Sequence, residues 1–163
     1  MEKINSLTGM TDLIETKADE NVLANKVFQT EKILKEIFTN YAMSEIRTPA
    51  LENTNLFKRS VGDTSDIVNK ELYTFSDKND KSITLRPEGT ASVMRSIIEK
   101  KLDGETHKLW YLGPMWRYER PQKGRYRQFN QAGIEILGYP EGAPEFEMIS
   151  LICELNRKLQ IRK

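Results

Sequence analysis

The chain has 163 residues, with 25 Lys or Arg against 24 Asp or Glu, and its formal net charge is +1. This balance excludes a general attraction to nucleic acid, so any such contact requires a local basic patch. The 38% hydrophobic and 30% charged residues are typical of a soluble globular protein, and the length fits one domain. No apolar run is long enough to cross a membrane, the start has no signal-peptide core, and one cysteine excludes an internal disulfide. We therefore expect a cytoplasmic protein without membrane contact.

A long amphipathic helix is the first predicted element. Residues 1–13 contain turn formers and show little periodicity. Asp19 or Asn21 is a candidate cap for a helix that ends near Tyr41. The apolar side chains of this helix form a broad stripe that requires a substantial partner surface. The stripe consists of Leu23, Val27, Ile33, Leu34, Ile37, Phe38 and Tyr41.

Short elements follow the first helix. Ser44–Glu52 is predicted to be extended, and Pro49, which has no donor N–H, indicates an edge, a bulge or an interface strand. One or two helical turns are predicted to end at Gly62, and residues 63–70 to form a polar loop. The apolar residues of these turns are Leu56, Phe57 and Val61.

An antiparallel hairpin is predicted next, with strands at Leu72–Phe75 and Ser82–Leu85 around a polar turn. It leads into Arg86-Pro87-Glu88-Gly89-Thr90, where Thr90 is a good cap for a helix to about Leu102. The apolar face of that helix consists of Val93, Met94, Ile97, Ile98 and Leu102.

Glu88 has two interpretations at this strand-to-helix turn. It can interact with the helix dipole, which contributes only about 0.3–1 kcal/mol. Alternatively, it can bind an ammonium group of a ligand, as exposed carboxylates at functional sites do. We favour the second interpretation.

The stretch from Leu109 to Gly138 organises the chain, because its two ends alternate with the period of a strand. The alternation predicts a hairpin with one apolar face to bury and one face that carries functional groups. The apolar face holds Trp110, Leu112, Trp116, Ala132, Ile134 and Ile136, and the other holds Tyr111, Gly113, Arg117, Phe129, Gln131, Gly133 and Glu135.

The loop of this hairpin is long and basic. Between Arg117 and Arg127 there are five Lys or Arg and one Glu. Loops of this length are usually functional or disordered, and arginine binds phosphate oxygens in bidentate geometry, so we expect a polyphosphate ligand. A mobile, solvated charged loop is the alternative, but it leaves the alignment of Arg117, Gln131 and Glu135 unexplained.

The last predicted helix begins at Pro144. Its apolar stripe consists of Phe146, Ile149, Ile152 and Leu155, and Cys153 is expected to be a small core residue beside it. Strands interleaved with helices predict an α+β fold, an antiparallel sheet with flanking helices.

The run from Arg117 to Phe129, Arg-Tyr-Glu-Arg-Pro-Gln-Lys-Gly-Arg-Tyr-Arg-Gln-Phe, resembles the second signature motif of class II aminoacyl-tRNA synthetases. Gly133-Ile-Glu135 and Gly9-Met-Thr-Asp12 make the resemblance specific to histidyl-tRNA synthetases, and it covers nearly the whole chain. It implies a ligase that activates histidine with ATP and transfers it to tRNA(His). It also implies a homodimer built through the first helix and the Pro49 strand.

The resemblance assigns roles to individual residues. Arg117 matches the catalytic arginine that contacts both the amino-acid carboxylate and the α-phosphate. ATP would be bound by Arg117, Glu119, Arg125 and Phe129, with Mg2+ accompanying the nucleotide and no metal site built by the protein. Histidine would be bound by Glu88, Gly89, Thr90, Gln131 and Glu135.

The chain departs from the family pattern in three respects. Tyr118 and Asn130 stand where the family usually has histidine, which we interpret as tolerated variation. The sequence also stops at Lys163, before the third signature motif and the anticodon-binding domain. We therefore expect residues 1–163 to be the N-terminal portion of a class II catalytic domain, incomplete for catalysis.

Two other functions remain open. The synthetase-like regulatory subunit of ATP phosphoribosyltransferase binds histidine but would be expected to lose parts of the ATP-binding loop. A stand-alone ATP- or RNA-binding module is supported only by the basic loop.

Overall fold

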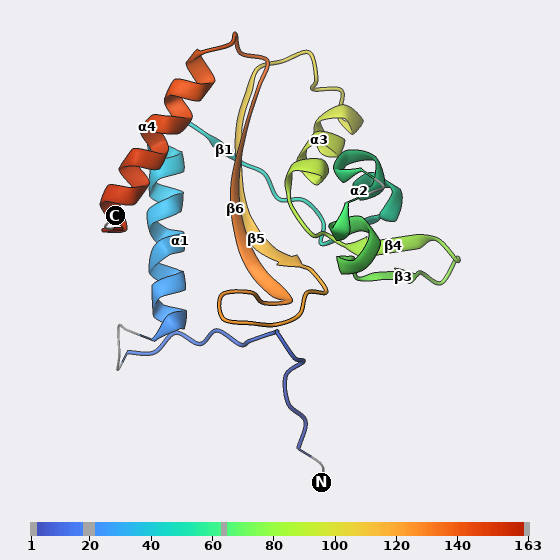
Figure 1. Ribbon diagram of the computed structural model, residues 1–163. Coiled ribbons are helices and arrows are strands. Elements are labelled where there is room, and N and C mark those ends of the chain that lie inside the picture. Colours follow the sequence, from blue (N-terminus) through green and yellow to red (C-terminus); the bar gives the residue numbers. More distant parts are fainter. Residues whose placement is uncertain (1–2, 18–21, 63–64, 162–163) are drawn as a thin grey trace. The chain divides into compact units, whose positions relative to one another are not determined.

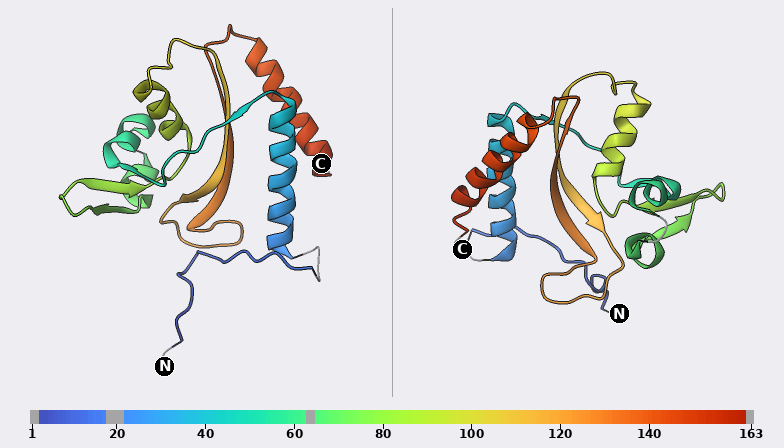
Figure 2. Two further views of the ribbon diagram at one scale, coloured as in Figure 1. Left: turned by 180° about the vertical axis from the view of Figure 1, so that it is seen from behind. Right: turned by 45° about the horizontal axis from the view of Figure 1, so that its top comes forward.

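The computed structural model describes residues 3–17, 22–62 and 65–161, and the chain divides into two compact units (Figures 1 and 2). The first unit comprises the described parts of residues 1–12, 47–102 and 111–133, and the second those of residues 13–46, 103–110 and 134–163. Helices and strands are mixed along the chain, which confirms the α+β class. The elements are α1 (Leu23–Asn40), β1 (Ser44–Glu45), β2 (Leu51–Asn53), α2 (Thr54–Val61), the π-helix η1 (Ile67–Glu71), β3 (Thr74–Ser76), β4 (Ser82–Leu85), α3 (Thr90–Glu99), β5 (His107–Trp116), β6 (Gln128–Leu137) and α4 (Ala143–Lys158).

The first unit contains the sheet β2-β4-β3, in which both strand pairs are antiparallel. The predicted β3–β4 hairpin is confirmed. Its turn is fixed by the Asp77 carboxylate, which accepts the backbone N–H groups of Lys81 at 2.9 Å and Asn79 at 2.7 Å. These two hydrogen bonds hold the pKa of Asp77 below its usual value, because they favour the charged form.

The second sheet has the order β1-β5-β6. β5 and β6 run in opposite directions as one long hairpin, as predicted (Figure 1). β1 pairs parallel to β5, with Ser44 opposite Leu109, so the predicted antiparallel arrangement does not extend to this short strand. Pro49 lies between β1 and β2, where its missing N–H interrupts no ladder.

Both faces of β5 are covered, whereas the alternation predicts one buried and one functional face. In the second unit Trp110 is 5% exposed, and its ring stacks on Phe38 with the centroids 5.1 Å apart. In the first unit Tyr111 and Met115, on the other face, are 7% and 0% exposed. Ala132 on β6, predicted to be buried, is exposed. Alternation sets which residues share a face, but the elements packed against each face decide what is covered.

In the second unit, most of the apolar residues predicted to form the stripe of α1 are buried or partly buried. Leu23, at the start of the helix, is 57% exposed. The residue before the helix is Val22, and the candidate caps Asp19 and Asn21 lie outside the described residues. The buried members of the stripe are Leu34, Ile37 and Phe38.

α4 begins as predicted, with Pro144 in its first turn and the Glu145 carboxylate accepting the N–H of Gly142 at 2.8 Å. Its predicted buried stripe is wrong. Cys153 is exposed and is not a core residue. Three members of the stripe are also exposed, namely Phe146 (77%), Ile149 (61%) and Ile152 (49%).

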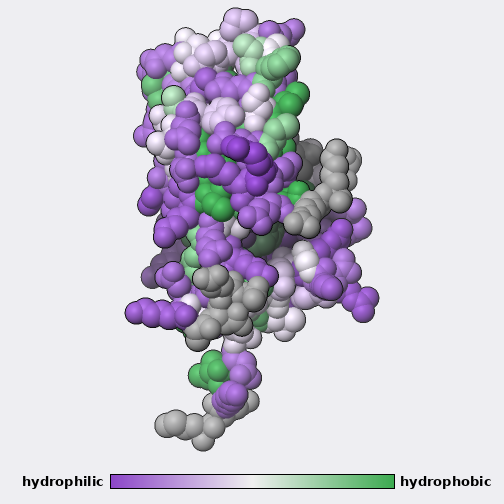
Figure 3. Space-filling view, turned by 90° about the vertical axis from the view of Figure 1, so that its left-hand side faces the viewer, coloured by the Kyte–Doolittle hydropathy of each residue, from purple (hydrophilic) through white to green (hydrophobic). Residues whose placement is uncertain are grey.

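The covered face of α4 instead carries Leu151, which is 3% exposed. Two ion pairs hold this face inward, Glu147 with Lys108 at 2.6 Å and Lys158 with Glu36 at 2.7 Å. Both ion pairs lie on the same helical face as Leu151, and the hydrophobic pattern alone predicts the rotation of α4 wrongly. On the side of the molecule that carries α4, hydrophobic side chains stand at the surface among hydrophilic ones (Figure 3).

In the first unit α2 follows the prediction. The Asn53 side chain caps it by accepting the N–H of Asn55 at 2.9 Å, and Gly62 ends it with φ at 91°. Phe57 in its centre is fully buried. Among the residues described in the structure, no helix has both the length and the apolar character that crossing a bilayer requires.

The loop predicted for residues 63–70 is wrong in its second half, because η1 covers Ile67–Glu71. The Ser65 hydroxyl accepts the N–H of Val68 at 3.3 Å and so supports the first turn of η1. Asp63 and Thr64 lie outside the described residues.

α3 begins at Thr90 and ends at Glu99, before the predicted end at Leu102. Thr90 is the first helical residue, and the N-cap position is occupied by Gly89. The carboxylate of Glu88 accepts the N–H of Thr90. The buried face is narrower than predicted, because Ile98 is 62% exposed. Val93 and Ile97 are buried as expected.

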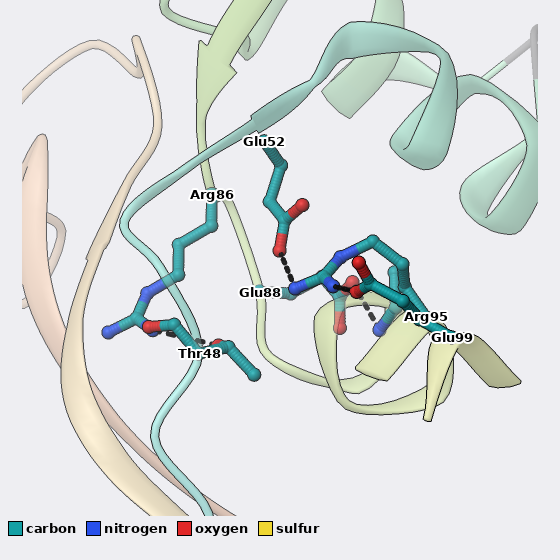
Figure 4. A network of polar contacts seen from close by, with 7 residues as sticks. Thr48, Glu52, Arg86, Glu88, Arg95 and Glu99 are labelled. Carbon is teal, nitrogen blue, oxygen red and sulfur yellow. Dashed lines mark hydrogen bonds and ion pairs between the residues drawn. The ribbon is translucent and has the colours of Figure 1, made fainter. Parts of the chain in front are cut away.

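An ion-pair network joins α3 to β2 within the first unit (Figure 4). Arg95 lies 2.7 Å from Glu52 and 2.6 Å from Glu99. The side chain of Glu52 is 6% exposed and that of Glu99 is 68% exposed. Hydrogen bonding to Glu52 raises the pKa of Arg95.

Arg95→Met is expected to lower the free energy of unfolding by about 3 kcal/mol, because Glu52 would be left as a buried carboxylate without this partner. Glu99→Gln removes the exposed partner of the same arginine and should cost less than about 1 kcal/mol. Urea unfolding followed by circular dichroism measures both values. Equal losses would contradict the assignment of this stability to the buried pair.

Candidate nucleotide and amino-acid site

The basic loop, residues 117–127, joins β5 to β6 and folds back on itself. The Arg117 N–H donates to the Arg127 carbonyl at 3.0 Å, which continues the hairpin beyond the strands. At the tip, Gln122 and Arg125 exchange backbone hydrogen bonds of 2.9 and 3.2 Å around a turn that contains Gly124 at φ 81°. The cationic side chains are therefore presented from a defined backbone.

A cavity of about 590 Å³ lies beside the basic loop, within the first unit. The residues predicted to bind ATP, Arg117, Glu119, Arg125 and Phe129, all line it. They come from both ends of the loop, so the fold of the hairpin brings them together. The remaining lining residues are Glu71, Gly124, Tyr126 and Asn130.

Two arginines flank one carboxylate in this cavity. Glu119 lies 3.6 Å from Arg125 and 4.0 Å from Arg117. Arg117 also donates its Nε–H to the Pro87 carbonyl at 3.0 Å, and its guanidinium lies 5.2 Å from the centre of the Phe129 ring. The side chain of Arg125 is 64% exposed and that of Arg117 is 25% exposed. An entering anion would thus meet an exposed charge at Arg125 and a more buried one, held by Pro87, at Arg117.

Glu88 caps α3. Its carboxylate oxygens accept the N–H of Thr90 at 2.6 Å and that of Ala91 at 3.0 Å. This is the helix-terminus role that the sequence left open beside ammonium binding. A carboxylate has about four acceptor positions, so the cap leaves room for an ammonium donor.

The residues predicted to bind histidine do not all line one cavity. The N–H of Gly89 donates to the side-chain oxygen of Gln131 at 3.0 Å, which connects the start of α3 to β6. Glu88 and Thr90 line a different cavity of about 1050 Å³, bordered by α2 and α3, and do not line the cavity of Arg117.

Tyr111 is a candidate site residue that the sequence reasoning missed. Its ring lies against Gly89 and Gly133, where a Cβ on either glycine would come within 2.2 Å of ring carbons. Glycine is therefore required at both positions by the close approach of the ring. The only sequence signal was the pair of glycines, and neither of them indicates which side chain fills the space.

Glu135 lies on β6 with the same strand parity as Gln131, in the part of the strand that belongs to the second unit. Asn130, one of the departures from the family pattern, lines the cavity beside Arg117. Tyr118, the other departure, packs edge-to-face on Tyr73 with the centroids 5.4 Å apart.

Similarity to known proteins covers almost the whole chain. The family model described as histidyl-tRNA synthetase matches residues 20–163. A histidine–tRNA ligase of Desulfitobacterium hafniense is 54% identical over 134 residues, which is 81% of this chain and 32% of that protein. One of Prochlorococcus marinus is 45% identical over 164 residues, which is 100% of this chain and 37% of that protein. The chain thus spans about a third of the length of these relatives.

Solved structures agree in fold. The crystal structure of apo S. aureus histidyl-tRNA synthetase matches with a TM-score of 0.75 and 38% identity, over 96% of this chain and 35% of that one. A Bacillus halodurans protein described as an ATP phosphoribosyltransferase regulatory subunit/histidyl-tRNA synthetase matches with a TM-score of 0.78 over 100% of this chain and 40% of that one. At 21% identity, that second likeness concerns the fold alone. The family match, the close relatives and the fold together show that the chain belongs to the histidyl-tRNA synthetase family.

Proposed function

We propose that this chain supplies the nucleotide-binding and amino-acid-binding part of an enzyme that activates histidine with ATP and transfers it to tRNA(His). The observation that carries the proposal is the convergence of Arg117, Glu119, Arg125 and Phe129 on one cavity. The regulatory-subunit alternative predicts a damaged ATP loop, so this complete set favours the synthetase. We further propose that residues 1–163 form a portion of a class II catalytic domain.

Activation joins two anions, the carboxylate of histidine and the α-phosphate of ATP. A fixed cation between them lowers the barrier by neutralising charge that develops in the transition state. Arg117 suits this task, because its contacts with Pro87 and Phe129 hold it in place. Phe129 offers a ring for adenine, and stacking of a base on an aromatic ring contributes about 1–3 kcal/mol. Glu119 would accept from the adenine amino group, and Arg125 would contact the phosphates.

For histidine, we propose that Gln131 and Gly89 hold the amino-acid backbone and that Glu88 and Thr90 contact the α-ammonium. The hydrogen bond between Gly89 and Gln131 supports the first pair. Glu135 would accept an imidazole N–H, a role supported by its parity with Gln131 along β6.

Mg2+ would reach the site with ATP. Among the described residues no group of three or more His, Cys, Asp or Glu could hold a metal ion, but magnesium usually needs only one or two carboxylates beside the phosphates. Glu71 lines the cavity, has no other role in this proposal and would supply such a carboxylate. When bound, the ion would neutralise phosphate charge.

The chain is also proposed to pair with a second copy, as the family resemblance implies. β2 is an edge strand of the sheet β2-β4-β3, and Leu51 on it is 44% exposed, which supports contact with a partner. Light scattering at high micromolar concentration should show a dimer, and a monomer would contradict the proposal. We place the protein in the cytoplasm, where tRNA charging takes place and where a single free cysteine stays reduced.

A chimaera tests the proposed function. In it, residues 1–163 replace the matching third of the Desulfitobacterium hafniense histidine–tRNA ligase. The chimaera should exchange pyrophosphate into ATP only when histidine is present, and should charge tRNA(His). Phe129→Leu in the same chimaera should raise the KM for ATP by about tenfold or more. A folded chimaera without histidine-dependent exchange would contradict the proposal.

A further inference from the structure

A tight turn near the start of the chain touches the base of the basic loop, within the first unit. The Gly9 carbonyl accepts the N–H groups of Arg127 at 2.8 Å and Gln128 at 3.2 Å. Gly9 has φ at 80°, and a Cβ there would lie 3.0 Å from Cγ and 3.1 Å from the backbone nitrogen of Arg127. Both the backbone conformation and the contact require glycine at this position.

The side chain of Arg127 contacts the opposite end of the loop. Its guanidinium lies 4.0 Å from the centre of the Tyr118 ring, and its Nε–H donates to the Glu119 carbonyl at 3.1 Å. Tyr118 is itself held by Tyr73 on one side, and its N–H donates to the Glu71 carbonyl at 2.7 Å. The two ends of the loop are therefore tied to each other through one arginine.

Arg127 is not among the residues that line the cavity beside the loop. Two residues connected to Arg127 do line the cavity. These are Glu119, whose carbonyl accepts the Nε–H of Arg127, and Phe129, two positions further along the chain. Its position therefore affects the cavity through the backbone and not through contact with a ligand.

We propose that the Gly9 turn is a strap that holds the basic loop in its ligand-binding shape, with Gly9 and Arg127 as positioning residues. The ligand in question, ATP, rests on the proposed function, but the ordering of the loop does not. Loss of the strap leaves every cavity-lining side chain in the sequence and removes only the fixed geometry in which the chain presents them.

The test compares Gly9→Ala and Arg127→Leu with matched controls in the 163-residue chain. Gly104→Ala is the glycine control, because a Cβ there meets nothing within 4 Å. Arg120→Leu is the arginine control, an exposed residue of the same loop. Hydrogen exchange at the amides of the loop is measured without ligand, and affinities for ATP and for histidine are measured by calorimetry.

Gly9→Ala and Arg127→Leu should speed exchange at Arg127 and Gln128 and weaken ATP binding by about tenfold, with histidine affinity kept within about twofold. Arg127→Lys, which keeps the cation over Tyr118, should recover part of the ATP affinity. The controls should leave amide exchange unchanged.

Three results would overturn the proposal that the Gly9 turn holds the loop. The first is unchanged amide exchange in both Gly9→Ala and Arg127→Leu, and the second is an equal loss of ATP and histidine binding. The third is an equal change of amide exchange in the control variants. Failure of the unmodified chain to bind ATP would overturn the proposed function instead, and the strap would then be decided by amide exchange alone. Arg127→Leu keeps the test decisive if Gly9→Ala does not fold.

Discussion

Arg117→Ala is expected to slow the formation of histidyl adenylate by about 10²–10³-fold, the usual effect of removing a donor that stabilises transition-state charge. Histidine affinity should fall far less than the rate, because the charge that Arg117 neutralises on the α-phosphate develops in the transition state and not in the histidine complex. Histidine-dependent pyrophosphate exchange in the chimaera measures the rate, and calorimetry measures the affinity.

Two further variants separate the charge of Arg117 from its position. Arg117→Lys keeps the charge but loses the Nε–H bond to Pro87, so a slow rate in this variant would show that fixed geometry matters as well. Arg120→Ala removes a cation of the same loop that does not line the cavity. This variant should leave the rate of pyrophosphate exchange close to that of the unmodified chimaera. An unchanged exchange rate in Arg117→Ala would move the catalytic role to another residue.

Glu135→Ala is expected to reduce histidine activation by about 10⁴-fold, while the affinity for ATP is preserved. A site built around a substrate N–H discriminates at about this level against analogues that lack it. In Glu135→Ala the substrate keeps its imidazole N–H, and this group is then left unpaired in the site. Glu135 lies on the same face of β6 as Gln131, and its carboxylate can accept an imidazole N–H. Glu135→Gln can still accept a hydrogen bond, so histidine activation should fall less in this variant than in Glu135→Ala.

The alternative is that Glu135 is a structural partner of another side chain, such as an arginine. In that case Glu135→Ala would either weaken the binding of ATP and of histidine equally or leave both affinities unchanged. Arg86, one arginine to consider, donates to the Thr48 carbonyl at 2.8 Å (Figure 4). It also donates to the Pro114 carbonyl at 3.1 Å, and burial lowers its pKa. Glu141→Gln, on an exposed turn, is the matched control and should change neither affinity.

The sequence by itself determined the elements whose boundaries depend on local chemistry. α2 ends at Gly62, where only glycine readily adopts φ at 91°. α4 begins at Ala143, with Pro144 in its first turn and the Glu145 carboxylate accepting the N–H of Gly142. The β3–β4 hairpin follows from the polar turn at Asp77. In each case the deciding contacts lie within a few residues of each other.

The motif residues of the nucleotide site were also predictable. Arg117 and Phe129 stand at the two ends of one loop, so a hairpin brings them together without help from distant segments. The sequence left two roles open for Glu88, because bonding to the start of α3 and binding of an ammonium group use the same carboxylate at the same turn. The structure shows the first of these roles.

Only the tertiary structure decided which faces are covered and which distant residues meet. α4 turns Leu151 inward and leaves Phe146 exposed, and its charged residues pair with Lys108 and Glu36, which are far away in the sequence. Tyr111 fills the space that Gly89 and Gly133 leave open, and Arg127 meets Gly9 across more than a hundred residues of chain. Hydrophobic period and turn chemistry are local properties, whereas these contacts depend on where the chain returns, and no local pattern carries that information.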